Sequence, residues 1–176
     1  VHLIQGQLIH EGIPRGIVLA QAAQGLQLDA LGIAGDDLGK LNDELSKMQT
    51  RTSLIDLHGL AQEAGRLGKN TVEDVLGYVK AADQLNVALE DLGEGATQAM
   101  AKVTEIFGVE AELGTENSLL SVGSTINVLS QNCSAGKSYL SEFTQRMAGV
   151  GAQAKMTVPE IMAFAAVLDT QGQKVE

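Results

Sequence analysis

Residues 131–138, QNCSAGKS, end in the Gly-Lys-Ser triplet of a phosphate-binding loop. In such a loop the backbone N–H groups and the lysine hold phosphates, and the apolar run ending at Asp169 would supply a magnesium ligand. Two observations argue against a nucleotide site. Gln131 replaces the first loop glycine, and the preceding segment has a helical stripe where a buried parallel strand would be continuously apolar. We therefore predict a helix end, a polar turn and a second helix here.

Cysteine and histidine are the next candidates for chemistry. Cys133 is the single cysteine, and as a nucleophile it would need a histidine close to it in space. His2, His10 and His58 have no metal-ligand spacing among them. We predict that His58 lies at the surface or boundary of a helix.

Paired carboxylates at Glu90, Asp91 and Glu94 are of the type that glycosidases use. They stand beside Gly93 and Gly95 at a predicted helix junction, where acids commonly favour the dipole of the next helix. The interpretation as helix-end residues is the better one. We therefore predict no enzyme activity and assign no catalytic, metal-binding or cofactor-binding residue.

The composition limits the classes of fold and partner. The 176 residues hold 12 Lys plus Arg against 22 Asp plus Glu, which gives a net charge of -10. Because nucleic-acid phosphates are bound by positive charge, we expect no direct binding of nucleic acid. Aromatic residues make up 3% of the chain, which favours helices over a β-sandwich or barrel. A single cysteine allows no intrachain disulfide, as suits a reducing compartment. The uncharged stretch 117–136 contains several Asn, Ser and Gln residues, so we predict no membrane span in this chain.

Seven segments carry apolar residues at steps of three and four, the spacing of one helical face. The stripes are Leu38, Leu41, Leu45 and Met48; Leu57, Leu60, Ala64 and Leu67; Val72, Val75, Val79, Ala82 and Leu89; Ala96, Met100, Val103 and Phe107; Leu119, Val122, Ile126 and Leu129; Leu140, Phe143, Met147 and Val150; and Val158, Ile161, Met162, Ala165 and Leu168. Each helix must bury its stripe against another helix. The sequence predicts an all-α fold, a compact bundle of about seven short amphipathic helices.

The chain divides into two parts. We expect residues 1–53 to be partly irregular, with a short helix at 17–24 and one longer helix at the end, and residues 54–176 to form a helical core region. A chain that begins at Val1 and ends at Glu176 is expected to be part of a longer protein.

An internal repeat lies within the second part. Residues 71–79 reappear in chemical character 86 residues later at 157–165, and Asp83 meets Asp169 at the same offset. Both copies start with capping-box spacing, and an Ala-Gly pair precedes each copy with a two-residue difference in the loop. We predict a duplicated helix–loop–helix unit, near 54–90 and 138–176.

A set of short motifs runs in order along residues 54–176. They are AGRLG at 64–68, VKAAD at 79–83, VAL at 87–89, LGE at 92–94, Lys102 with Ile106 and Phe107, VGSTIN at 122–127, Ser134 with Ala135, Phe143, RMAG at 146–149 and LDTQGQ at 168–173. In order and spacing this stretch resembles the conserved core region of bacteriophage tail tape measure proteins, which phages and prophages encode. At 131–138 that family has a Ser-Ala-rich helix junction.

The resemblance implies a structural role in the virion tail. Tape measure proteins are long helical chains in the lumen of the growing tail tube; they set its length and leave on genome ejection. Assembly takes place in the host bacterial cytoplasm. The implied partners are tail tube subunits, tail assembly chaperones, tail tip or baseplate proteins and further copies of the same chain. The alternative is a soluble helical protein-interaction module unrelated to phage.

The glycine content bears on how such a chain could act as a ruler. As one helix, 176 residues would reach about 260 Å, with a radius of gyration of about 75 Å. The 20 glycines and two prolines instead divide the chain into short helices. We expect a folded module with a radius of gyration of about 16 Å, which either lies at one end of the tail or unravels to enter the tube.

Overall fold

The computed structural model describes residues 33, 35–89, 92 and 95–172. Within these ranges the chain forms seven α-helices and no strand, which confirms the all-α class and the compact arrangement of short helices. The helices are α2 (Gly35–Lys47), α3 (Leu54–Arg66), α4 (Val72–Ala88), α5 (Ala96–Ile106), α6 (Val109–Asn132), α7 (Lys137–Gln153) and α8 (Val158–Thr170). The predicted helix at 17–24 lies outside the described residues.

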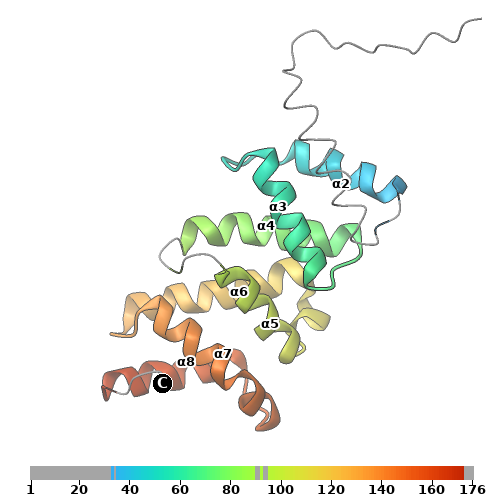
Figure 1. Cartoon of the computed structure of the whole chain (residues 1–176). Helices are drawn as coiled ribbons and strands as arrows, with labels where there is room; N and C mark the ends of the chain where they lie inside the picture. The colour runs from blue at the N-terminus through green and yellow to red at the C-terminus, as the bar shows by residue number, and fades with distance from the viewer. Residues whose placement is uncertain (1–32, 34, 90–91, 93–94, 173–176) are drawn as a thin grey trace, which may run out of the picture.

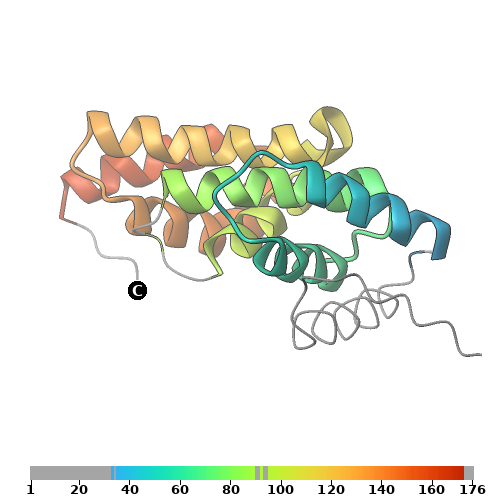
Figure 2. The same cartoon turned by 90° about the horizontal axis from the view of Figure 1, so that it is seen from above.

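The seven helices lie in two layers. Helices α2, α4, α6 and α8 form a row in which each helix packs on the next, from α2 at the top of Figure 1 to α8 at the bottom. Helices α3, α5 and α7 lie on one side of this row, as the view from above shows (Figure 2). Each layer covers the apolar face of the other, which is the arrangement that amphipathic helices require.

The core is aliphatic, as the composition predicts. Most of the predicted stripes are confirmed, with Leu41, Leu45, Val75, Val79 and similar residues almost fully buried. One large cluster of buried residues joins α2 to α6 and reaches Val158 and Met162 of α8. A smaller cluster fills the far end between α7 and α8.

The predicted face of α7 is correct at Leu140, which is fully buried, and wrong toward the end of the helix. Val150 is exposed and Met147 is half-buried, whereas Ser141, Thr144 and Gly151 are buried. The reason is a close approach of the next helix, because a Cβ at Gly151 would collide with the side chain of Ile161. After Leu140, the buried face of α7 is therefore formed by small residues, and Met147 and Val150 do not mark it.

The two predicted capping boxes lie at helix starts. Thr71 is the N-cap of α4, and its Oγ1 accepts a hydrogen bond from the N–H of Asp74 at 3.1 Å. Thr157 caps α8 with the complete reciprocal pair, since its own N–H donates to Oε2 of Glu160 at 2.7 Å. The pKa of Glu160 is lowered mainly by this backbone hydrogen bond and also by the hydrogen bond that the hydroxyl of Thr157 donates to the same carboxylate. The caps satisfy N–H groups that have no partner within the first turn.

Helix α6 changes direction near its start. Gly114 has φ 76° and ψ 168°, a non-helical conformation that separates residues 109–113 from the long helical part 115–132. Glycine adopts this conformation without the steric penalty that other residues carry there. The short first piece, residues 109–113, thereby lies near the N-terminal end of α4. This brings Glu110 toward the α3–α4 turn.

The predicted repeat units correspond to the pairs α3–α4 and α7–α8. A hydroxyl just before each pair bonds its second helix. Oγ1 of Thr50 donates to Oδ1 of Asp83 in α4 at 2.8 Å, and Oγ of Ser134 donates to Oδ2 of Asp169 in α8 at 2.7 Å. The two hydroxyls stand 84 residues apart and the two carboxylates 86, which is the two-residue difference expected from the loops. The same kind of contact thus occurs at equivalent positions, and the duplication itself stays a prediction.

Candidate functional site

The structure does not form a phosphate-binding loop at 131–138. Helix α6 ends at Asn132, a four-residue turn follows, and α7 begins at Lys137, which confirms the predicted helix end, turn and second helix. Nζ of Lys137 donates to the carbonyl oxygen of Ala88 at 3.3 Å. A lysine at the carbonyl end of α4 favours the helix dipole. The residue that suggested phosphate binding therefore joins α7 to α4.

Two other residues near this turn have structural partners. The thiol of Cys133 donates to the carbonyl oxygen of Leu129 at 2.9 Å, within the last turn of α6. Asp169, the candidate magnesium ligand, accepts the hydrogen bond from Ser134. The two segments that suggested a nucleotide site, 131–138 and the run ending at Asp169, do meet in the structure. Their contact is the hydrogen bond from Ser134 to Asp169, which fixes the turn to α8.

His58 is buried, so its predicted place at a surface or boundary is wrong. Helix α3 packs on both α2 and α4. Its buried residues are Leu57, His58, Ala61 and Ala64, so the buried face extends beyond the predicted stripe of Leu57, Leu60, Ala64 and Leu67. Burial lowers the pKa of His58, because desolvation disfavours the charged imidazole. The histidine is therefore a neutral core residue at pH 7.

The remaining candidates concern metals and membranes. His2, His10, Glu90, Asp91 and Glu94 lie outside the described residues. Among the residues that the structure does describe, no group of three or more His, Cys, Asp and Glu side chains could hold a metal ion. None of the helices described is both long enough and apolar enough to cross a membrane, and this includes the 24-residue α6.

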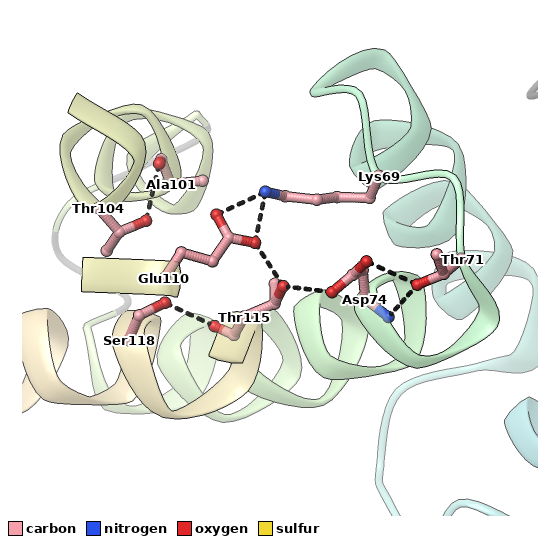
Figure 3. A network of polar contacts seen from close by, with 8 residues as sticks. All are labelled: Lys69, Thr71, Asp74, Ala101, Thr104, Glu110, Thr115 and Ser118. Carbon is pink, nitrogen blue, oxygen red and sulfur yellow. Dashed lines mark hydrogen bonds and ion pairs between the residues drawn. The ribbon is translucent and has the colours of Figure 1, made fainter. Parts of the chain in front are cut away.

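A cluster of polar side chains connects the α3–α4 turn with the start of α6 (Figure 3). Nζ of Lys69 lies 2.5 Å and 2.6 Å from the two carboxylate oxygens of Glu110. Both side chains are largely buried, with 12% of Lys69 and 19% of Glu110 exposed. An ion pair with so little access to water is screened far less than a surface pair. It fixes two turns that stand 41 residues apart in the chain.

The cluster continues through Thr115 to α4. Oγ1 of Thr115 is within hydrogen-bonding distance of Glu110 and lies 3.1 Å from Oδ1 of Asp74. The other carboxylate oxygen of Asp74 accepts from Oγ1 of Thr71 at 2.6 Å. One hydroxyl thus lies between two carboxylates, and Lys69 supplies the positive charge beside them.

The arrangement of this cluster determines what it can do. The charged groups Lys69, Glu110 and Asp74 all have partners within the cluster, and the Thr71 cap completes it. Such groups hold one another and are not presented to a substrate. We interpret the cluster as a clamp that fixes the bend at Gly114 and joins α3, α4 and α6.

Sequence reasoning missed this clamp, and it missed a second buried polar pair. The fully buried Tyr78 of α4 donates its phenol hydrogen to a carboxylate oxygen of Glu63 in α3. Burial, together with the hydrogen bond and negative charge of Glu63, raises the pKa of Tyr78. The two partners are 15 residues apart and lie in different helices, so the periodicity of a single helix or strand does not reveal the pair.

Comparison with known protein families gives one match for this chain. A family model described as phage-related minor tail protein matches residues 36–176, which begins in α2 and includes all later helices. No curated protein and no solved structure matches the chain. The match favours a phage tail protein over a helical module unrelated to phage. Because it covers most of the sequence, the chain belongs to the phage-related minor tail protein family.

Proposed function

We propose that this chain is the folded core segment of a tape measure protein, which sets tail tube length during assembly and leaves on genome ejection. The observation that carries the proposal is the family match over residues 36–176, which includes the stretch that resembles the tape measure core. The role is structural and not enzymatic. The clamp of Lys69, Glu110 and Thr115 fits this role, because its groups bind one another and stabilise the fold.

The two-layer bundle supports a particular form of this role. Residues 35–172 as a single helix would span about 207 Å, whereas the packed helices share one large core. The folded module is therefore not an extended ruler by itself. It either lies at one end of the tail or unravels when it enters the tube.

The proposed partners follow from that location. They are tail tube subunits, tail assembly chaperones, tail tip or baseplate proteins, and further copies of the same chain. The proposed locations are the lumen of the tail tube in the virion and the host bacterial cytoplasm during assembly. A lumenal chain is shielded by tube subunits, whereas a minor protein on the outside of the tail is exposed.

Protease protection before and after genome ejection tests this proposal. Intact virions and virions that have ejected their genome are treated with protease, and peptides of residues 36–172 are quantified by mass spectrometry. We expect protection in intact virions and loss of these peptides from the particle after ejection. Cleavage in intact tails, or retention in emptied ones, would assign the chain to another minor tail protein.

An in-frame duplication of residues 35–172 in the parent protein distinguishes the two forms of the role. A module that unravels in the tube should lengthen the tail by up to about 200 Å, the length of the added helix. A module that stays folded at one end should leave the length of the tail nearly unchanged. Electron microscopy of the assembled tails measures the difference.

A further inference from the structure

A cavity of about 570 Å³ lies between α3, the end of α4 and the first turns of α5. This volume is within the range of ligand pockets, which is about 300–1,000 Å³. Its apolar walls come from Leu60 of α3, Leu85 and Leu89 at the end of α4, and Met100 of α5. Walls of this kind are suited to the aliphatic part of a ligand.

Glu63 of α3 is the charged residue at this cavity, since the other lining residues that the structure describes are neutral. Tyr78 holds its carboxylate in place by donating the phenol hydrogen to one of the two oxygens. Burial raises the pKa of Tyr78, so this residue supplies a hydrogen bond and no charge. The ion pairs among the described residues are those of Lys40, Lys47 and Lys69, so no basic side chain there neutralises Glu63.

Two helix ends meet at the cavity, and their dipoles oppose each other. Helix α4 ends at Ala88 with no basic residue in its last turn, and α5 begins at Ala96 with no acidic residue in its first turn. A helix carries about half a negative charge at its C-terminus and about half a positive charge at its N-terminus, so the two contributions largely cancel. The carboxylate of Glu63 therefore makes the cavity negative.

We propose that this cavity binds a lysine side chain of a basic partner protein. Lysine joins an aliphatic stem of four carbons to an ammonium group with three donors, which matches apolar walls beside a carboxylate. Asn86 and Gln98 also line the cavity, and their amide oxygens are further acceptors. The net charge of -10 attracts a basic partner at longer range. The inference does not rest on the tape measure assignment.

The contact between Tyr78 and Glu63 favours lysine over arginine. A guanidinium group binds a carboxylate best through two parallel hydrogen bonds, one to each oxygen. One oxygen of Glu63 already accepts from Tyr78, which leaves the other for the ligand. A single oxygen suits the compact ammonium group, whereas the planar fork of arginine would lose its second bond.

A titration followed by ¹⁵N–¹H NMR of the 176-residue chain tests the site. The probe is the peptide acetyl-Gly-Lys-Gly-amide at concentrations up to about 30 mM, which suits a contact made by one side chain. The same peptide with norleucine or arginine in place of lysine should bind at least tenfold more weakly. Added salt should weaken the binding of the lysine peptide. Saturable shifts are expected at the backbone N–H groups of Leu60, Leu85, Thr97 and Gln98.

Three variants separate the cavity from general attraction to an acidic protein. Glu63→Gln removes the charge and keeps the shape, so it should weaken binding tenfold or more. Asn86→Phe, at an exposed position on the cavity wall, should block the cavity with a similar effect. The matched control is Glu73→Gln, an exposed carboxylate at the start of α4, which changes the net charge equally and should leave binding unchanged. Circular dichroism melts show that each variant is folded.

Four results would overturn the proposal. The first is a wild-type chain without saturable shifts up to about 30 mM lysine peptide, or with shifts only at residues outside the cavity. The second is equal binding of the norleucine or arginine peptide. The third is full binding by the folded Glu63→Gln and Asn86→Phe variants. The fourth is an equal loss of binding in Glu73→Gln, which would show that net charge alone attracts the peptide.

Discussion

Leu85 of α4 packs directly against Gly123 of α6, and its side chain occupies the space where a Cβ of residue 123 would lie. Leu85 is almost fully buried, so it has little room to move aside. Close to the start of the same helix pair, Gly77 lies against the backbone of Glu116. These contacts hold α4 and α6 close together, where the two halves of the row meet.

Gly123→Ala should lower the free energy of unfolding by about 1–3 kcal/mol, because the added methyl group overpacks the core beside Leu85. The matched control is Gly39→Ala on α2, where nothing lies within 4 Å of the added Cβ. The control should stabilise the protein by about 0.5–1 kcal/mol through helix propensity. Urea unfolding of both variants measures the difference. An equal gain in stability at both positions would contradict the close packing of α4 on α6.

Lys69→Met should destabilise the protein by about 1–3 kcal/mol, since it leaves Glu110 largely buried without its positive partner. The additional change Glu110→Gln should recover part of that loss. Chemical unfolding of both single variants and the double variant gives the coupling energy.

The exposed pair of Lys47 and Glu44 provides the control for the clamp. Both of its side chains are more than half exposed, so Lys47→Met should change stability little. Equal effects at Lys69 and Lys47 would mean that the clamp is not a stabilising element.

His58 should make stability depend on pH near neutrality. Burial lowers its folded-state pKa below the ordinary value of 6.5, so its contribution is fully present above pH 6.5. As the pH falls through 6.5, the unfolded chain binds a proton that the folded chain does not, and the free energy of unfolding decreases. His58→Gln should reduce this decrease between pH values of about 7.5 and 5.5, as measured by urea unfolding. A wild type and variant with parallel pH profiles would show that His58 keeps its ordinary pKa.

Thr157→Ala should destabilise α8 by about 1 kcal/mol, because it removes the side-chain half of the reciprocal cap with Glu160. Thr157→Ser keeps the hydroxyl and should retain most of the stability. Thermal unfolding followed by circular dichroism measures both. Should the alanine and serine variants melt at the same temperature, the hydroxyl would make no contribution to the cap.

The sequence predicted what depends on neighbours along one helix. The spacing of Leu41 and Leu45, or of Val75 and Val79, reveals a buried face because residues three and four apart share a side of the helix. The caps at Thr71 and Thr157 were predicted for the same reason, since donor and acceptor lie within one turn. The seven helices and their class follow from such local signals.

What depends on the approach of a distant helix was not predictable in this way. Val150 has the spacing of a core residue, yet α8 packs on the small side of α7 at Gly151. His58 is buried because α3 has two neighbours in space. The contact of Lys69 with Glu110 requires the bend at Gly114, which the periodicity of α6 does not reveal.

The row of α2, α4, α6 and α8 has the same order in space as in the chain. Every helix therefore packs on helices that are synthesised shortly before or after it, and the contact order of the fold is low. Folds of this kind form rapidly, and they need not wait for the far end of the polypeptide. We expect α2, α3 and α4 to assemble while the ribosome is still producing α8, so that apolar faces are covered in succession during translation.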